Sequence, residues 1–546
     1  MKNNFFSQEQ DYRKEARARM QVRDWSIRFS LWVGILLLVP LVGLSKAVVP
    51  SLGMHHKFYV KRIKIEGNSL VRTSTLEKAV SSYEGKRVDL GELEKAAEAV
   101  TKVYAEHGYG FARAFIPPQT LSHGVVVIYV VEGKIGKIKV VGNKFYSTRF
   151  VKWYLSGAVH KGVLSSRELE RALFLLNEYP DLHVHAYLSK GREAGTTDVT
   201  VYVKDSRPIH EELGYDNFGN PYVGRNRVSL DVWDGDLTGR GDLLNLEGVY
   251  AFSKPEEAPF VDANYSIPVS SSGTTVGVSY SNADIKVGEN LAILDIRGTA
   301  QIYGLEMNQP LARTSNFQSN WDAAFNYKDV DDFILGSFLT SRDRIRDIGL
   351  GYNMMYSGRD TRDYFDVHVS QGLGTLFGGM SSHNPYVSRF GATDLFTLVR
   401  AHGAHIWRVY GDDYVIFRSD AQLGFDPLPV TEEFSLGGPD SVRGYQQSEY
   451  LGDSGWDMSG EFRLPLWRRK QDIVQMAFFL DTGFSTIRYP LPGQTAKDHL
   501  TGGGFGFRAA LGKSTSARID FGFPLQPQPN PEHQSPVIYA SVSHIF

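Results

Sequence analysis

The feature that most constrains the fold is an alternation of apolar and polar residues through the C-terminal two-thirds of the chain, from Pro208 onward. The stretches 276–280 and 365–369 show it clearly. Successive side chains of a strand point to opposite faces, so these stretches predict strands with one apolar face. About 340 residues at roughly 20 per strand and connection predict about 16 strands, an even number, as a closed single-chain barrel requires.

A membrane-spanning barrel fits this pattern better than a soluble β-sandwich or propeller, although alternation alone leaves all three open. The region is too long for a single sandwich, and no blade-length repeat is visible. Short turns such as 270–273 contrast with longer polar connections such as 530–535, as in barrels with short periplasmic turns and long outer loops. The mean hydropathy of −0.26 is like that of a soluble protein, but it does not exclude a barrel, because averaging hides the lipid-facing residues.

Two similar modules precede the predicted barrel. The sequence IKIEGN at 63–68 recurs as IKVVGN at 138–143, and the surrounding patterns also match. In the first module, Thr73 is expected to cap a helix around 76–80, a second helix over 90–107 ends at Gly108, and strands follow over 111–116 and 125–131. The second module has expected helices at 148–155 and 165–177 and strands at 183–189 and 198–203. The sequence therefore predicts two βααββ modules, over 57–133 and 134–205, each a three-stranded sheet with two helices on one face.

Each such sheet has an open edge, which is a template for an extended client chain. This favours peptide binding, with a rigid spacer as the alternative. The candidate client-binding residues lie on the expected edge strands: Phe111, Arg113, Phe115, His183, His185 and Tyr187.

The N-terminus predicts export. The apolar segment 29–44 is shorter than the roughly 20 residues that a membrane-spanning helix needs. A long basic segment precedes it, and Ser45-Lys46-Ala47 resembles a cleavage site, so residues 1–47 are predicted to be a signal peptide. An uncleaved anchor in the inner membrane is the alternative. Under either interpretation the remainder leaves the cytoplasm.

Composition removes several functions. With 59 Lys and Arg against 61 Asp and Glu, the chain is not charged like a nucleic-acid binder. It has no Cys, which excludes disulfides, thiolate metal sites and cysteine nucleophiles. The G-D-S-G at 452–455 matches chymotrypsin-like proteases but lacks their sequence context. We therefore expect no enzymatic activity, no cofactor and no metal.

Three stretches are more specific than the alternation: DNFGNPYVGRNR at 216–227, GGPDSVRGY at 437–445 followed by the strand 460–466, and FLDTG at 479–483. In this order, after paired modules and before a terminal Phe, they give a chain that resembles the outer-membrane transporters of two-partner secretion systems. These are of the hemolysin secretion/activation type, in a superfamily that also contains barrel-assembly proteins. The resemblance covers essentially the whole exported chain. It implies two POTRA domains of α+β fold and, over 206–546, a transmembrane antiparallel β-barrel.

The resemblance also implies a site. The V-R-G-Y motif would lie at the tip of a sixth extracellular loop that folds into the barrel lumen, and it comprises Val442, Arg443, Gly444 and Tyr445. The F-x-D-x-G motif of a late barrel strand comprises Phe479, Asp481 and Gly483. An arginine held away from bulk water needs a carboxylate, and a bidentate pair fixes its position and orientation. We therefore expect Arg443 to pair with Asp481, Gly444 to permit a tight backbone and Tyr445 to pack against the wall.

The function implied by the resemblance is an outer-membrane, protein-conducting pore with its POTRA modules in the periplasm of a Gram-negative cell. It would recognise the N-terminal secretion domain of one large exoprotein, whether adhesin, cytolysin or contact-dependent toxin, and export it without nucleotide hydrolysis. Its other expected contacts are outer-membrane lipid and lipopolysaccharide, with no nucleic acid, and it is expected to be a monomer. The alternative is a barrel-assembly insertase, although those relatives usually have more than two POTRA modules. A passive porin or an outer-membrane enzyme would leave the modules without a purpose.

The chain departs from the family in one respect. Family members often carry an N-terminal helix that plugs the pore and a proline-rich linker to the first POTRA domain. Here only ten residues, 48–57, separate the predicted cleavage site from Phe58, too few for a helix and a linker. Either the sixth loop and other extracellular loops close the pore, or the long basic N-terminal region has a role other than that of a signal peptide.

Overall fold

The computed structural model describes residues 57–121, 123–251, 260–381, 383–527 and 535–546. The predicted signal peptide and most of the 530–535 connection lie outside the described residues. The chain divides into two compact units, and each is described by itself. One contains the two α/β modules, and the other contains 206–546 together with 179–181.

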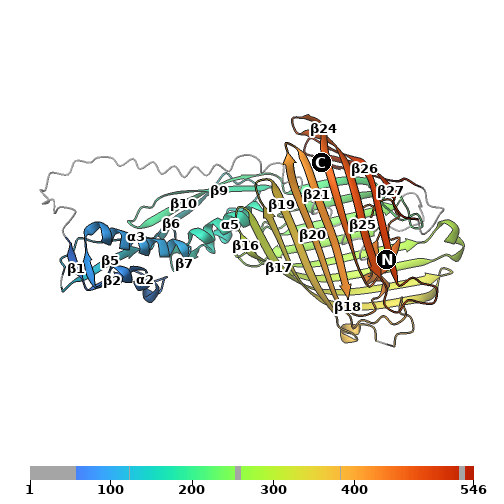
Figure 1. Ribbon diagram of the computed structural model, residues 1–546, viewed down its shortest axis with the longest axis horizontal. Coiled ribbons are helices and arrows are strands. Elements are labelled where there is room, and N and C mark those ends of the chain that lie inside the picture. The colour runs from blue at the N-terminus through green and yellow to red at the C-terminus, as the bar shows by residue number, and fades with distance from the viewer. Residues whose placement is uncertain (1–56, 122, 252–259, 382, 528–534) are drawn as a thin grey trace. The chain divides into compact units, whose positions relative to one another are not determined.

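The second unit is a closed antiparallel barrel, seen as the green to red strands of Figure 1. Each strand pairs with the next barrel strand along the chain, and the last closes on the first. The sixteen strands in the described part are β11 (Ile209–Asp216), β12 (Arg227–Asp234), β13 (Leu243–Ala251), β14 (Phe260–Pro268), β15 (Thr275–Lys286), β16 (Arg297–Arg313), β17 (Phe317–Ile334), β18 (Phe338–Ser357), β19 (Thr361–Gly372), β20 (Thr397–Tyr410), β21 (Asp413–Gly424), β24 (Ser454–Arg469), β25 (Asp472–Thr486), β26 (Lys497–Leu511), β27 (Thr515–Pro524) and β28 (Val537–Ile545). The predicted barrel of about 16 strands is confirmed.

The barrel has the inside-out polarity of a membrane protein. On β24, Trp456 and Met458 are 39% and 51% exposed, whereas the alternate residues Asp457 and Ser459 are buried. An apolar outer face and a polar interior suit a wall surrounded by lipid. Within the described ranges, no helix is both long and apolar enough to cross a bilayer.

The connections differ at the two ends of the barrel. At the end where β11 begins, the shortest connections are two-residue turns such as 411–412, and the longest is 235–242. At the other end the two longest connections are 373–396 and 425–453. This is the asymmetry of short turns and long loops that the sequence predicts. The connection 425–453 contains its own hairpin, β22 (Phe434–Leu436) with β23 (Tyr450–Gly452).

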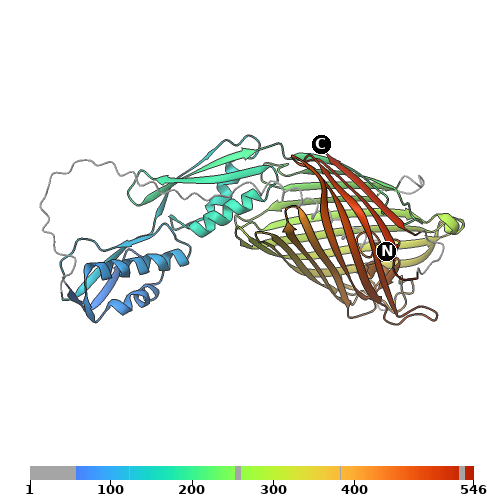
Figure 2. The ribbon, with the colours of Figure 1, turned by 45° about the horizontal axis from the view of Figure 1, so that its top comes forward.

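The first α/β module has a three-stranded sheet in the order β2-β5-β4, and its helices lie in front of the strands in Figure 2. Its elements are β1 (Phe58–Val60), β2 (Arg62–Glu66), α2 (Thr73–Val80), the 3₁₀ turn η1 (Ser81–Tyr83), β3 (Lys86–Val88), α3 (Leu90–Glu106), β4 (Arg113–Phe115) and β5 (Val125–Val131). A small β1–β3 pair, which the sequence does not predict, joins the βααββ order. The expected Thr73 cap is wrong: Arg72 precedes α2 without a capping side chain, and the Thr73 hydroxyl accepts a hydrogen bond from Asn68.

The second module has five strands, in the order β7-β8-β6-β10-β9, where the sequence predicts three. Its elements are β6 (Lys134–Val141), α4 (Thr148–Ser156), β7 (Val159–His160), β8 (Val163–Leu164), α5 (Ser166–Asn177), β9 (Leu182–Lys190) and β10 (Thr196–Asp205). The extra strands β7 and β8 have two residues each, too few for a period to show. The two modules are joined where the Gly108 carbonyl, just beyond α3, accepts hydrogen bonds from Ser165 and Ser166 at the start of α5.

Candidate functional site

The connection 425–453, here called loop 6, is the sixth connection at the long-loop end of the barrel. Residues 431–439 and 441–445 are buried. Loops normally lie on the surface, because their backbone polar groups need water. Loop 6 is therefore folded into the barrel, where wall residues replace the solvent as hydrogen-bonding partners.

Arg443 lies in the buried stretch 441–445 of this loop and has no exposed surface. Its Nε and Nη2 donate to the two carboxylate oxygens of Asp481 on β25, at 2.7 and 2.8 Å. Its Nη1 donates to Glu461 at 2.6 Å and its Nη2 to Ser459 at 3.0 Å, both on β24. The bidentate contact uses the fork of the guanidinium, which a lysine could not reproduce. The structure thus brings Arg443 and Asp481 together.

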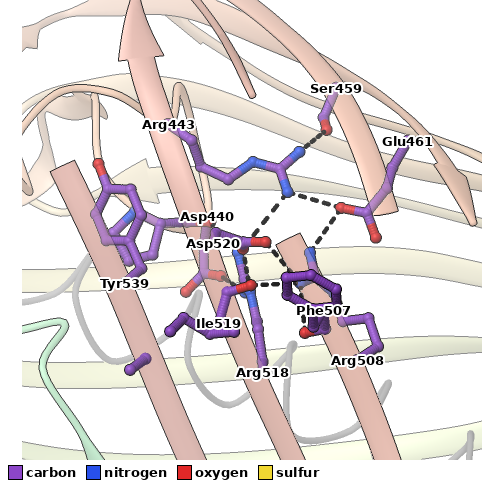
Figure 3. Close-up of polar contacts among 12 residues, drawn as sticks. Asp440, Arg443, Ser459, Glu461, Phe507, Arg508, Arg518, Ile519, Asp520 and Tyr539 are labelled. Atoms are coloured by element: carbon purple, nitrogen blue, oxygen red, sulfur yellow. Dashed lines mark hydrogen bonds and ion pairs between the residues drawn. The ribbon is translucent and has the colours of Figure 1, made fainter. Parts of the chain in front are cut away.

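The Arg443 contacts belong to a larger ionic network, and Figure 3 shows the part of it around Glu461, Asp520 and Arg518. Arg508 on β26 bridges Glu461 and Asp520, at 2.9 and 2.6 Å. Arg518 on β27 contacts Asp520 at 2.6 Å, and it reaches back to Asp440 of loop 6 at 3.2 Å. Including Arg463, which contacts Glu461, four arginines face four carboxylates in this network. Buried ions cost little only when they are paired in this way.

The backbone of the motif is held as closely as its side chains. Gly444 adopts φ +104°, a left-handed conformation that strains any other residue. Its N–H donates to the Tyr539 hydroxyl of β28 at 3.1 Å, and that hydroxyl donates to the Tyr445 carbonyl. The Tyr445 hydroxyl donates to the Thr501 carbonyl on β26 at 2.9 Å. The loop tip is therefore bonded to the final strand of the barrel as well as to β24–β27.

The wall is shaped to receive the loop. The Phe479 ring lies 3.5 Å below the Arg443 guanidinium, a cation–π contact. Gly483 leaves room for loop 6, since a Cβ there would lie 2.5 Å from the Leu436 side chain. Val442 is fully buried in an apolar cluster with Phe434, Leu436, Tyr445 and Leu500.

Sequence reasoning missed most of the wall partners. Glu461 and Ser459 lie two residues apart on β24, in or beside the quoted strand 460–466, and their spacing shows that they share a face. Nothing in their local sequence connects them with Arg443. Arg508, Asp520 and Tyr539 come from strands that the three motifs do not include.

Asp453 and Ser454 of the G-D-S-G stretch at 452–455 make structural contacts with neighbouring loops and strands. Asp453 is buried and pairs with Arg389, and it accepts hydrogen bonds from the backbone N–H groups of Leu428 and Arg488. The Ser454 hydroxyl bonds to the backbone of Gly424. Across the described ranges, no group of three or more His, Asp or Glu is placed to hold a metal ion.

Five of the six candidate client-binding residues lie on edge strands. Arg113 and Phe115 are exposed on β4, and His183, His185 and Tyr187 are exposed along one face of β9. The expected strand position of Phe111 is wrong, because this residue lies in a turn before β4. Strand β4 is only three residues long because the turn that follows Gly108 extends to residue 112, so the strand begins at Arg113.

The fold and the buried loop define a class: outer-membrane β-barrel transporters with periplasmic POTRA modules and a loop folded into the lumen. The family described as haemolysin secretion/activation protein ShlB/FhaC/HecB matches residues 195–509, and the ShlB-type POTRA domain matches 58–133. The first match covers more than half of the chain, so this chain belongs to the haemolysin secretion/activation family.

Curated relatives agree with this assignment. The heme/hemopexin transporter protein HuxB of Haemophilus influenzae is 25% identical over 436 residues, covering 78% of this chain and 76% of that protein. The outer membrane transporter CdiB of Escherichia coli is 24% identical over 425 residues, with 75% and 69% covered. The hemolysin transporter protein ShlB of Serratia marcescens is 22% identical over 466 residues, with 84% and 79% covered.

Solved structures show the same fold. CdiB from Escherichia coli superposes with a TM-score of 0.78 at 21% identity, covering 93% of this chain and 94% of that one. CdiB from Acinetobacter baumannii gives 0.73 at 17% identity, covering 99% and 98%. BamA from Haemophilus ducreyi lacking POTRA domains 1–3 gives 0.52 at 13% identity, covering 90% and 100%. The protein is accordingly an outer-membrane transporter of two-partner secretion, and the family match favours a secretion pore over an insertase.

Proposed function

We propose that this chain recognises one large exoprotein in the periplasm and exports it through the barrel lumen without nucleotide hydrolysis. The family assignment carries the proposal, and the relatives named as transporters of hemolysin and of heme/hemopexin support a secreted protein as the cargo. Adhesin, cytolysin and contact-dependent toxin are the candidate client classes. Folding of the client at the cell surface would make export directional, because no nucleotide is available outside the inner membrane.

In this proposal the chain has four segments: a signal peptide over 1–47, POTRA domains over 57–133 and 134–205, and the barrel over 206–546. The barrel acts as a monomer in outer-membrane lipid and lipopolysaccharide. The motif residues Val442, Arg443, Gly444 and Tyr445, with Phe479, Asp481 and Gly483 on the wall, set the position of loop 6 on which export depends. The support is the complete burial of Arg443 and its bidentate contact with Asp481.

The edges of the two POTRA domains are proposed as the client-binding surface. In the described part of each sheet, β4 pairs only with β5 and β9 pairs only with β10, so neither has a second strand partner. Side chains occupy part of each outer edge: the Ala114 N–H of β4 donates to the Thr101 hydroxyl, and the Val184 backbone of β9 bonds to the Asn177 side chain. Tyr187 is 63% exposed and Phe115 is 46% exposed, which would give an added strand apolar side chains to cover. His185 stacks on Tyr202 at 5.3 Å, which holds its ring on the same exposed face.

The transport proposal is tested by co-expressing the chain with a candidate large exoprotein that carries an N-terminal secretion domain and measuring that protein in the medium. Arg443→Ala should leave a heat-modifiable, inserted barrel but reduce secretion at least about tenfold, because the buried carboxylates lose their cation. Arg342→Ala is the matched control, since Arg342 makes an exposed pair with Asp331. Normal secretion by the Arg443→Ala variant would overturn the assigned role of the motif.

The binding surface is tested by cross-linking, which the absence of native cysteine makes clean. Single cysteines at Arg113 and Tyr187 should form cross-links with cysteines in the client's N-terminal domain. A cysteine at Lys95, exposed on helix α3, should not. Equal cross-linking at all three positions would contradict binding at the sheet edges.

A further inference from the structure

Loop 6 contacts the barrel wall at a second ionic site, eleven residues before Arg443 in the chain. Glu432 is only 1% exposed, although it carries a carboxylate. Its Oε1 lies 2.8 Å from Lys328 Nζ on β17, and its Oε2 lies 3.0 Å from Arg400 Nη2 on β20. A loop carboxylate therefore lies between two wall cations.

The strands around Glu432 hold the backbone of the loop as well. Lys328 also pairs with Asp347 on β18 at 2.9 Å, which fixes its ammonium group. The Gln422 side chain on β21 donates to the Glu432 carbonyl at 2.8 Å and accepts from Arg400 at 2.9 Å. This site is built by β17, β18, β20 and β21, whereas Arg443 is held by strands β24 to β27. The two sites use different parts of the wall.

The two sites also have opposite polarity. At one, a loop arginine lies among wall carboxylates, and at the other, a loop glutamate lies among wall cations. Either loop residue at the other's place would meet like charges in a buried setting, which is strongly unfavourable. The arrangement therefore admits one register of the loop across the lumen. A loop fixed at one point could swing, while a loop fixed at two points cannot.

We propose that Glu432, with Lys328 and Arg400, is a second and independent anchor of loop 6, and that the loop leaves the pore fully only when both anchors are broken. Glu432 is a positioning residue for the stem of the loop, as Arg443 is for its tip. This inference rests on the proposed role of loop 6 in export. It concerns where the loop lies, so it can be tested without a client.

The test uses single-cysteine reporters in the full-length protein. Thr431→Cys reports on the stem: Thr431 is 5% exposed and its hydroxyl makes no hydrogen bond, so the cysteine removes none. Val442→Cys reports on the tip, where Val442 is fully buried. The measurement is the labelling rate with a membrane-impermeant maleimide on protein in outer-membrane vesicles, with heat-modifiability confirming a folded barrel.

Glu432→Gln should raise the labelling rate at position 431 more than about tenfold and leave position 442 protected, because breaking a buried pair is costly at that site alone. Arg443→Gln should do the reverse. Glu449→Gln is the matched control: Glu449 is also on loop 6, but it accepts from Gln446 within the loop. It should leave both reporters protected.

Conductance in planar bilayers tests the consequence for the pore. Each single substitution should raise the mean conductance modestly, and Glu432→Gln with Arg443→Gln should raise it by more than the product of the two single effects. Lys328→Gln provides a second route to the same anchor and should also expose position 431. Unchanged labelling at 431 in folded Glu432→Gln and Lys328→Gln, or equal exposure of both reporters in Glu432→Gln, would overturn the second anchor. Normal secretion by Arg443→Ala would contradict the export role while leaving these labelling results intact.

Discussion

Gly502 on β26 shows how single residues of the wall are fitted to the loop tip. A Cβ at this position would lie 1.8 Å from the Arg443 carbonyl oxygen, which is a severe steric clash. The sequence marks the run 502–506 as a glycine-rich strand, which suggests a bend or a close backbone approach. The structure shows a close approach, made by a segment nearly sixty residues earlier in the chain.

Gly502→Ala should therefore displace Arg443 and reduce secretion about as much as Arg443→Ala, at a cost to loop docking of about 1–3 kcal/mol. The neighbouring Gly503 is the matched control, because its Cβ would meet nothing closer than the Phe479 carbonyl at 3.4 Å, an ordinary contact. Secretion of the exoprotein into the medium is the measurement. Equal secretion by Gly502→Ala and Gly503→Ala would show that the loop tip does not need this approach.

The two modules repeat a carboxylate at the same place. Glu132, after β5, accepts from the backbone N–H groups of Ser69 and Leu70 at 2.6 and 2.9 Å and from the Tyr104 hydroxyl at 2.7 Å. In the second module Asp205, at the end of β10, accepts from the backbone of residues 144–146. Each carboxylate holds the loop that follows the repeated Gly-Asn. The duplication predicted from sequence thus extends to a contact that the repeated hexapeptide does not contain.

The contacts of Glu132 give the first module a pH dependence. Burial raises the pKa of this carboxyl, but the hydrogen bonds from Ser69, Tyr104 and Leu70 outweigh burial and hold the pKa below its usual range. The stabilisation is therefore fully present above the unfolded pKa, about 4.3, and is lost as the pH falls through the lower folded pKa. Glu132→Gln keeps the shape and loses the charge.

At pH 7 this variant should destabilise the first module by about 1–2 kcal/mol, and the difference from the wild type should shrink below about pH 4. Urea unfolding at several pH values, read by amide hydrogen exchange at Ser69 and Leu70, provides the measurement. A difference that stays constant down to pH 2 would mean that the charge of Glu132 is not what holds the loop.

Among elements, the junction of β11 with β28 closes the barrel, and its register runs only from Glu212 opposite Ile545 to Asp216 opposite Ser541. Asn217 extends it: its side-chain oxygen accepts from the Ala540 N–H at 2.7 Å, and its side-chain nitrogen donates to the Ile538 carbonyl at 2.9 Å. The adjacent Asp216 pairs with Arg227 on β12 at 2.8 Å. The motif at 216–227, quoted from sequence without a role, thus secures the long-loop end of the closure.

Asn217→Ala should lower the temperature at which the barrel loses its compact mobility in SDS gels, because two hydrogen bonds to β28 are lost. Asn282→Ala is the matched control, since Asn282 bonds to Asp284 on its own strand, β15. The control should melt with the wild type. If both variants lost their compact mobility at the same temperature, the Asn217 side chain would not be stabilising the β11–β28 junction.

The elements also show where sequence reasoning succeeds and where it stops. The alternation with a period of two identifies barrel strands because every strand has one face toward lipid and one toward the polar lumen. The burial of loop 6 has no such local signature, since its tip is stabilised from three different strands: Arg443 pairs with Glu461 and Asp520, and the Gly444 N–H donates to Tyr539. The resemblance of the V-R-G-Y and F-x-D-x-G motifs to a family led to Asp481, and only the fold could supply the other partners.

For the whole molecule, the division into two units predicts two separate unfolding events. Each α/β module depends on a small apolar core, such as the cluster that includes Ile63, Leu76, Leu93 and Ile128 in the first module. Domains of that size are stable by about 5–15 kcal/mol and unfold reversibly in denaturant. The barrel has no open edge, and every strand is bonded on both sides, so water cannot enter the sheet strand by strand.

Full-length protein in detergent should therefore lose its helical circular dichroism at moderate urea while its β-barrel still resists SDS without heating. Glu132→Gln should move only the first event, and Asn217→Ala should move only the second, because the two residues lie in different units. Circular dichroism followed against urea, with SDS gels of the same samples, measures both. A single transition shifted by both substitutions would show that the two units unfold as one.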